Sequence, residues 1–146
     1  MSEKDIQATA VSYAGHAVLI QGNSGVGKTT LALQLIEKGA SLIGDDLVEV
    51  FIQKDRLYCR AKKNLKGVIE IRGLGLVRGL KTAEPVPVLC AVCLHTTMTE
   101  RLPENRTISL LGKKIPVFDF YACETNDIRV LYAIRVLKGQ LSLLKE

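Results

Sequence analysis

Gly22-Asn23-Ser24-Gly25-Val26-Gly27-Lys28-Thr29 fits the phosphate-binding pattern G-x-x-x-x-G-K-[ST] and is the most informative segment of the sequence. The glycines of such a loop let successive backbone N–H groups turn inward around phosphate oxygens. Lys28 can then reach the β- and γ-phosphates, and the Thr29 hydroxyl can ligate Mg²⁺. We therefore take every residue of this run as a candidate nucleotide-binding residue. A glycine-rich turn that holds no ligand is the alternative.

The segments that flank this run predict a strand before it and a helix after it. Residues 17–20 form a short apolar run, typical of a buried strand, and residues 30–38 have the pattern of a helix. Gly39 stands where a helix commonly ends on a glycine. Strand, loop and helix in this order direct a helix N-terminus at an anion. The context therefore favours a phosphate site over a simple turn.

Length and composition predict a single domain, residues 1–146. The chain has 146 residues, of which 47% are hydrophobic, and no apolar run is long enough to cross a bilayer. The first residues are both acidic and basic and do not resemble a signal peptide. We therefore expect a soluble, cytoplasmic protein with no membrane association.

The charge balance favours an acidic partner, such as a nucleotide or an acidic protein. The chain has 20 Lys and Arg against 15 Asp and Glu, which gives a formal net charge of +5. The basic residues are spread along the chain, and the aromatic residues are few, with no Trp. Because a stacking surface for single strands needs aromatic side chains, we expect no nucleic acid partner.

The cysteines do not predict a metal site. Cys90 and Cys93 have the C-x-x-C spacing of many zinc sites, but they lie in an apolar run typical of a buried strand. Positions three apart on a strand point to opposite faces, so the two thiols would not converge on one metal. We interpret the cysteines as structural thiols in a reducing compartment.

The rest of the chain has the pattern of many strands and one further helix. We expect strands at residues 6–13, 41–44, 47–52, 56–61, 67–71, 86–94, 107–111 and 115–120. A second helix should begin near residue 125, with Thr125 or Asn126 as its cap, and end at Gly139. The glycine-rich residues 72–79 are expected to form a mobile loop. This content predicts an α/β or α+β domain with a mixed sheet.

Two acidic positions add chemistry to the phosphate loop. Asp45 and Asp46 end the strand expected at residues 41–44, where P-loop proteins commonly complete a Mg²⁺ shell. Neighbouring side chains on an extended backbone diverge, so one carboxylate can face a metal while the other accepts a proton from an attacking hydroxyl. Glu70 and Arg72 share one strand face and could contact Mg²⁺ and developing phosphoryl charge. A solvated acidic turn and a surface ion pair are the alternatives.

Three blocks of the sequence together resemble the kinase domain of bacterial HPr kinase/phosphorylase, in a short form without that family's N-terminal domain. They are residues 22–29, residues 39–46 and the run Ile69-Glu70-Ile71-Arg72-Gly73-Leu74-Gly75-Leu76. The resemblance implies the P-loop kinase fold shared with phosphoenolpyruvate carboxykinase, with a mixed β-sheet and flanking helices. It also implies a protein serine kinase of phosphotransferase-system regulation that uses ATP and Mg²⁺, acts on an HPr-like phosphocarrier protein and assembles as a homo-oligomer, a hexamer in the family.

The resemblance further implies roles for single residues. Lys28 would bind phosphate, Asp46 would be the base that accepts the proton of the target serine, and Arg72 would lie in the catalytic loop. The residues that would hold or support Mg²⁺ are Thr29, Asp45 and Glu70.

The chain departs from the family pattern at Gln7, where the family carries an active-site histidine. An amide can hydrogen-bond but cannot titrate. The family's Pro-Val-Arg-Pro-Gly-Arg type segment, which serves the dephosphorylating direction, is absent, so the kinase direction is expected. Two other hypotheses stay open: a P-loop kinase or NTPase with another acceptor, and a nucleotide-sensing module with weak turnover or none.

Overall fold

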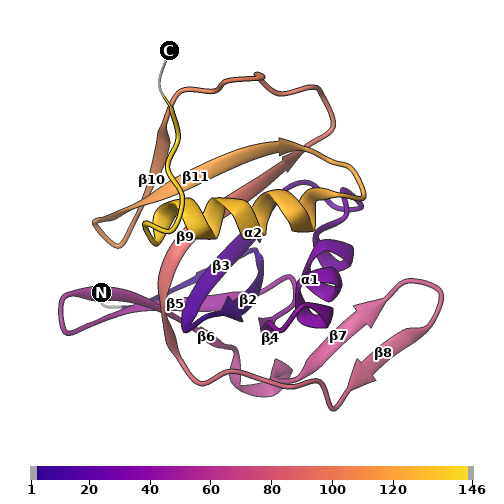
Figure 1. Ribbon diagram of the computed structural model, residues 1–146. Helices are drawn as coiled ribbons and strands as arrows, with labels where there is room; N and C mark the ends of the chain where they lie inside the picture. Colours follow the sequence, from indigo (N-terminus) through magenta and orange to yellow (C-terminus); the bar gives the residue numbers. More distant parts are fainter. Residues whose placement is uncertain (1–2, 145–146) are drawn as a thin grey trace.

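The computed structural model describes residues 3–144, which form a mixed β-sheet with two α-helices, as the sequence predicts (Figure 1). In chain order the elements are β1 (Glu3–Ile6), β2 (Thr9–Tyr13), β3 (His16–Gln21), α1 (Lys28–Glu37), β4 (Ser41–Gly44), β5 (Val48–Gln53), β6 (Arg56–Ala61), a 3₁₀ helix (Lys63–Leu65), β7 (Val68–Ile71), β8 (Gly75–Arg78), β9 (Val86–His95), β10 (Arg106–Leu110), β11 (Lys113–Tyr121) and α2 (Asn126–Leu137).

The long strand β9 organises the sheet. Its sequence VPVLCAVCLH is almost wholly apolar, which is the pattern of a strand covered on both faces. The second half of β9 runs parallel to β3 on one side and to β11 on the other, whereas its first residues pair antiparallel with β6. The strand order is β1-β5-β6-β9-β3-β2-β4, and β11 and then β10 branch from β9. The carboxyl ends of β3, β9 and β11 therefore meet at one edge of the sheet.

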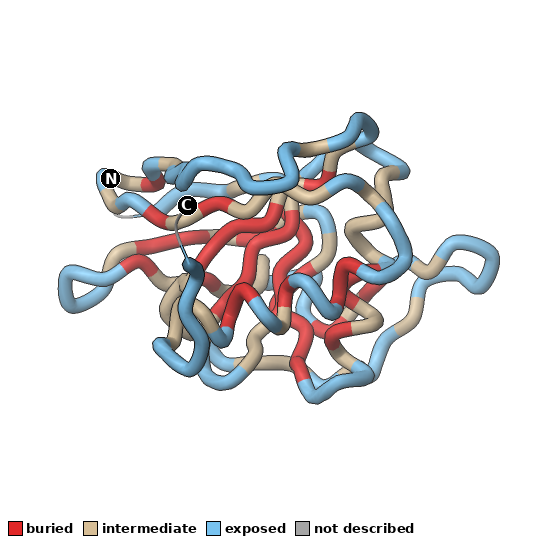
Figure 2. Tube along the Cα trace, turned by 45° about the horizontal axis from the view of Figure 1, so that its top comes forward, coloured by how far each residue is buried: buried red, intermediate tan, exposed pale blue. Residues whose placement is uncertain are grey.

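The helices α1 and α2 cover one face of this sheet. Leu31, Ala32 and Leu35 are buried, and their spacing places them on one side of α1. They pack with Val130 and Ile134 of α2 against side chains of β3 and β9. Figure 2 shows that the buried residues gather along the central segments of the chain, whereas the turns and a projecting hairpin are exposed.

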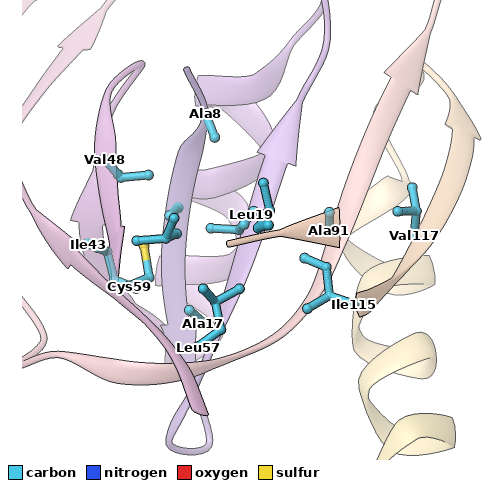
Figure 3. Packing of buried hydrophobic residues seen from close by; sticks show 13 residues of the cluster. Ala8, Ala17, Leu19, Ile43, Val48, Leu57, Cys59, Ala91, Ile115 and Val117 are labelled. Carbon is cyan, nitrogen blue, oxygen red and sulfur yellow. The ribbon is translucent and has the colours of Figure 1, made fainter. Parts of the chain in front are cut away.

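A second apolar cluster lies on the opposite face of the same strands, against the β5–β6 hairpin. Figure 3 shows Leu19 of β3 in the middle of this cluster, between Cys59 of β6 and Ala91 of β9. Leu19 has no exposed surface. The central strands are therefore buried on both faces.

The two cysteines of the C-x-x-C spacing lie on different faces of β9, which confirms the prediction from strand geometry. Cys90 belongs to the cluster under the helices, whereas Cys93 packs against the cluster on the other face. Burial raises the pKa of the Cys90 thiol to about 12. Burial thus disfavours the thiolate, which is the reactive form of a cysteine.

Two expectations about the strands are wrong. Residues 6–13 are divided between β1 and β2, because β1 pairs with β5 whereas β2 pairs with β3 and β4. Residues 72–79 are not a loop, since β8 pairs with β7 in a hairpin that projects from the body of the protein (Figure 1). Gly73 takes the positive φ of 88° in the turn between them. The other expected strands and both helices are confirmed, with small shifts at their ends.

The predicted cap position of α2 is confirmed, but the cap lacks a side-chain hydrogen bond. Thr125 occupies the N-cap position but makes no capping hydrogen bond. The Asn126 amide is turned inward instead, where it donates to the Tyr121 carbonyl at 2.9 Å. The helix ends near Gly139, which has a φ of 77°. Among residues 3–144, neither helix is long and apolar enough to cross a membrane.

Leu19→Ala should lower the free energy of unfolding by about 2–5 kcal/mol, because it removes buried methyl groups and leaves a cavity in the central strand. Urea unfolding followed by circular dichroism measures the change. Leu74→Ala is the matched control, since Leu74 is 73% exposed in the β7–β8 turn. The same truncation there should change stability by less than about 0.5 kcal/mol. Equal losses in the two variants would contradict the assigned core.

Candidate functional site

Residues 22–29 connect β3 to the first turn of α1, so the phosphate-binding pattern lies at a helix N-terminus. Gly22 has a φ of 149°, and a Cβ at this position would lie 2.9 Å from the Leu94 carbonyl oxygen, so only glycine fits. The Lys28 ammonium donates to the Gly22 carbonyl at 2.7 Å. The first backbone N–H groups of a helix have no acceptor within it. The loop therefore presents an ammonium and several amide donors together.

The Asp45 carboxylate joins segments that are distant in the sequence. Its Oδ1 accepts hydrogen bonds from the Thr29 hydroxyl at 3.0 Å and from the Thr9 hydroxyl at 3.1 Å. Its Oδ2 accepts one from the backbone N–H of Glu70 at 3.2 Å. These donors belong to α1, β2 and β7, and Asp45 itself follows β4. One side chain thus holds the phosphate-loop helix next to the β7–β8 hairpin.

The adjacent Asp46 has a strained backbone. Its φ of 69° lies in the left-handed region, which costs an ordinary residue about 1–3 kcal/mol. Two hydrogen bonds hold this conformation: the Asp46 N–H donates to the Thr9 hydroxyl at 3.3 Å, and the Asp46 carbonyl accepts from the Ala8 N–H at 3.2 Å. The Asp46 residue is exposed, whereas Asp45 is half-buried. The two neighbouring carboxylates therefore lie in different surroundings.

Glu70 and Arg72 lie on the projecting hairpin, Glu70 in β7 and Arg72 in the turn that follows, and both are exposed. The backbone N–H of Glu70 donates to Asp45, whereas among the described residues Arg72 makes no hydrogen bond to Asp45 or to its partners Thr9 and Thr29. Between residues 3 and 144, no cluster of three or more His, Cys, Asp or Glu is arranged to hold a metal. Mg²⁺ commonly takes one or two carboxylates together with phosphate oxygens and water. The hard oxygens of Thr29 and Asp45 fit such a partial site.

Thr9 is a residue of this site that sequence reasoning missed. It is fully buried, donates to Asp45 and accepts from the Asp46 N–H. Its signal in the sequence was a lone hydroxyl at the start of an apolar strand. That signal does not reveal the bond, because β2 and the turn after β4 meet only in the folded sheet.

A second polar group lies at the carboxyl ends of β9 and β11, and sequence reasoning missed it as well. Asp119 accepts two hydrogen bonds from the Arg106 guanidinium, at 2.8 and 2.7 Å, and its Oδ1 lies 2.7 Å from His95 Nε2. A hydrogen bond from Arg106, and to a lesser extent one from His95, holds the pKa of Asp119 below its ordinary value. Arg106 also lies 3.5 Å from the Cys93 thiol, whose neighbour in the sheet is Gln21. The group therefore shares the sheet edge at which the phosphate loop begins.

Comparison with known protein families places this site in context. A family model described as the HPr Serine kinase C-terminal domain matches residues 1–82. The matched segment contains the phosphate loop, both aspartates and the β7–β8 hairpin.

Several curated proteins are similar to the chain, and all of the following are named HPr kinase/phosphorylase. The Mycoplasma genitalium protein is 38% identical over 117 residues, which cover 71% of this chain and 38% of that protein. The Mycoplasmopsis pulmonis protein is 42% identical over 115 residues, with 75% and 36% covered. The Chlorobium phaeobacteroides protein is 31% identical over 140 residues, with 87% and 44% covered. The chain thus spans less than half the length of these relatives.

A solved structure shows that the likeness of fold continues past residue 82. The Hpr(Ser) kinase/phosphatase from Coxiella burnetii superposes with a TM-score of 0.81 at 23% sequence identity, covering 94% of this chain and 97% of that chain. The elements from β9 to α2, which the family model does not match, therefore belong to the same fold as the phosphate loop.

Thr9→Val should lower the free energy of unfolding by about 1–3 kcal/mol, because Asp45 then loses a donor and the Asp46 N–H loses its acceptor. Chemical denaturation measures the change. Thr107→Val supplies the control, since Thr107 is an exposed threonine in β10. Its expected change is within about 0.5 kcal/mol. If Thr9→Val were equally mild, the hydroxyl would not support the two aspartates.

The Arg106–Asp119 pair should make stability depend on pH at the acid end. The pKa of Asp119 is lower in the folded protein than in the unfolded chain. The contribution of the Asp119 carboxylate to the free energy of unfolding is therefore complete above the ordinary aspartate pKa of about 3.9. It is lost as the pH falls through the lower pKa that Asp119 has in the folded protein. The excess stability of the wild type over Asp119→Asn should be constant near neutral pH, at about 1 kcal/mol or less for a partly exposed pair. Urea titrations should show that this excess stability decreases below about pH 4. An excess stability that increases on acidification would contradict the Arg106–Asp119 pair as its source.

Proposed function

This chain belongs to the family of the HPr serine kinase C-terminal domain, and on that basis we propose that it is an ATP- and Mg²⁺-dependent kinase for a serine of an HPr-like phosphocarrier protein. The observation that carries the proposal is the Asp45 carboxylate, which bonds Thr29 of the phosphate loop to the strand that bears Glu70. The relatives that carry this name are more than twice as long as the matched segment. For this shorter chain the kinase activity is therefore a proposal.

The phosphate loop would hold the donor. The amide donors of α1 and the Lys28 ammonium lie together at the helix N-terminus and would bind the β- and γ-phosphates. Mg²⁺, when bound, would neutralise charge on the phosphate oxygens, with Thr29, Asp45 and Glu70 as its candidate ligands. Arg72, on the turn beside Glu70, would stabilise charge on the transferred group.

Asp46 is the proposed base. Its exposed carboxylate would accept the proton of the serine hydroxyl as the serine oxygen attacks the γ-phosphorus and the bond to the β-phosphate oxygen breaks, which releases ADP. Hydrogen bonds with Thr9 and Ala8 hold the Asp46 backbone, and this would keep its exposed carboxylate in one position beside the phosphate loop.

The projecting hairpin favours a protein as the acceptor over a small metabolite. Leu74 and Leu76 are 73% and 75% exposed on β8 and its turn, next to Glu70 and Arg72. Neighbouring exposed apolar side chains commonly mark a surface for another protein.

The hexamer implied by the resemblance stays a prediction, which light scattering would test.

The test is phosphorylation of a purified HPr-type phosphocarrier with radiolabelled ATP and Mg²⁺. Asp46→Asn should lower the rate of label transfer by about 10²–10⁴-fold, because an amide cannot accept the serine proton. Asp55→Asn is the matched control: Asp55 lies exposed in the β5–β6 turn, where it bonds only Lys113 among the described residues. Its rate should equal that of the wild type.

Two outcomes would contradict the proposal. Label transfer that is equally fast in Asp46→Asn would remove Asp46 as the base. ATP binding by calorimetry without transfer to any phosphocarrier serine would favour the nucleotide-sensing module instead.

A further inference from the structure

A cavity of about 250 Å³ opens beside the phosphate loop. It is lined by Val26 and Gly27 of the loop, by Thr30 and Gln34 of α1, and by the segment that joins β11 to α2. In Figure 1 the beginning of α2 lies beside the beginning of α1. The cavity therefore continues directly from the place where phosphate would be held.

Hydrogen bonds fix the wall that faces α1. The Gln34 amide donates to the Glu124 carbonyl at 2.9 Å, and the buried Asn126 amide donates to the Tyr121 carbonyl at 2.9 Å. Asn126 is only 2% exposed. Lys38 and Asp127 add an ion pair of 2.7 Å between the two helices. The segment between β11 and α2 is thus held at a set distance from α1, so the cavity is a built feature of the fold.

We propose that this cavity receives the nucleoside part of the phosphate donor, a base with its sugar. The inference rests on the proposed function, since it starts from a nucleotide whose phosphates lie on the loop. A volume of about 250 Å³ is slightly below the range of about 300–1,000 Å³ of pockets for whole drug-sized ligands. The triphosphate must then lie outside the cavity, on the loop, while the nucleoside fills it.

The chemistry of the lining suits a nucleoside. Val26, Leu31, Leu94 and Ala122 supply apolar walls for the flat faces of a base. The polar side chains that line the cavity, those of Thr30, Gln34 and Glu124 among them, can meet the sugar hydroxyls and the base edge. The described lining residues include no lysine or arginine, and Arg129, which lies 3.5 Å from the Cys123 thiol, is not one of them.

Cys123 lies in the lining and reports on whether the cavity is filled. Its exposed thiol lies 3.5 Å from the Thr125 hydroxyl and 3.5 Å from the Arg129 guanidinium. Hydrogen bonds from Thr125, aided by the charge of Arg129, lower the pKa of this thiol. Burial raises the pKa of Cys59 and of Cys90 to about 12.

The remaining thiol, Cys93, is half-buried, and its pKa is also raised by burial. Among the cysteines, Cys123 should therefore react first with an alkylating reagent, because the thiolate is the nucleophile.

The experiment measures the rate at which iodoacetamide modifies Cys123, by mass spectrometry, with ATP, with inorganic tripolyphosphate or with neither. Calorimetry first establishes that each ligand binds. Saturating ATP should slow the modification by about tenfold or more, since a site occupied at ten times its Kd leaves roughly a tenth of the protein free. Tripolyphosphate, which can occupy only the loop, should leave the rate unchanged.

Other outcomes overturn the inference. If ATP binds and Cys123 reacts as fast as before, or if tripolyphosphate protects equally well, the nucleoside does not lie in this cavity, although the phosphate loop keeps its proposed role. If neither ligand binds, the proposed function fails and this inference fails with it.

Thr30→Phe gives a second measurement that does not depend on the thiol. The larger side chain should fill the mouth of the cavity and weaken ATP binding about tenfold, or about 1.4 kcal/mol, with tripolyphosphate binding within about twofold of the wild type. Glu37→Phe, which introduces the same side chain on the exposed far end of α1, is the control and should change neither affinity. Equal weakening of both ligands by Thr30→Phe, or weakening of neither, would overturn the assignment.

Discussion

The hydrogen bonds of the Asp45 carboxylate are the constraint on which the candidate site depends. A half-buried carboxylate is costly unless donors replace the water it loses, and here the hydroxyls of Thr9 and Thr29 and the N–H of Glu70 do so. The same Thr9 hydroxyl accepts from the backbone of Asp46 and so supports its left-handed conformation. The position of the phosphate-loop helix, the attachment of the β7–β8 hairpin and the backbone conformation of Asp46 therefore depend on the hydrogen bonds that Asp45 and Thr9 make.

The parallel pairing of β3, β9 and β11 determines where the rest of the chemistry lies. The carboxyl ends of parallel strands share one edge of a sheet. Three features therefore come together there: the phosphate loop after β3, Asp119 with its partners His95 and Arg106, and the segment that leads from β11 into α2. The helices on one face and the β5–β6 hairpin on the other exclude water from the strands beneath that edge. The apolar centre is thus a rigid support for polar groups at its rim.

Local patterns predicted most of the elements, because their causes are local. The glycines and Lys28 of the phosphate loop, the short turns of the β5–β6 and β10–β11 hairpins and the helical spacing in α2 each depend on residues a few positions apart. The division of residues 6–13 into β1 and β2 was not predictable in this way, since it depends on the distant partner β5. The glycines of residues 72–79 have the composition of a mobile loop, but Gly73 forms the tight turn that lets β8 pair with β7.

Residue spacing and backbone geometry are enough to predict a phosphate loop at a helix N-terminus and acidic residues after the next strand. They also predict that the thiols of Cys90 and Cys93 lie on opposite faces of β9. Three contacts could be known only from the folded chain: Thr9 supports both aspartates, Arg106 and His95 share Asp119, and Gln34 of α1 holds the segment before α2 beside a cavity. The reason is that each of these contacts joins strands or helices far apart in the chain, and their meeting depends on which strands pair in the sheet rather than on any local pattern.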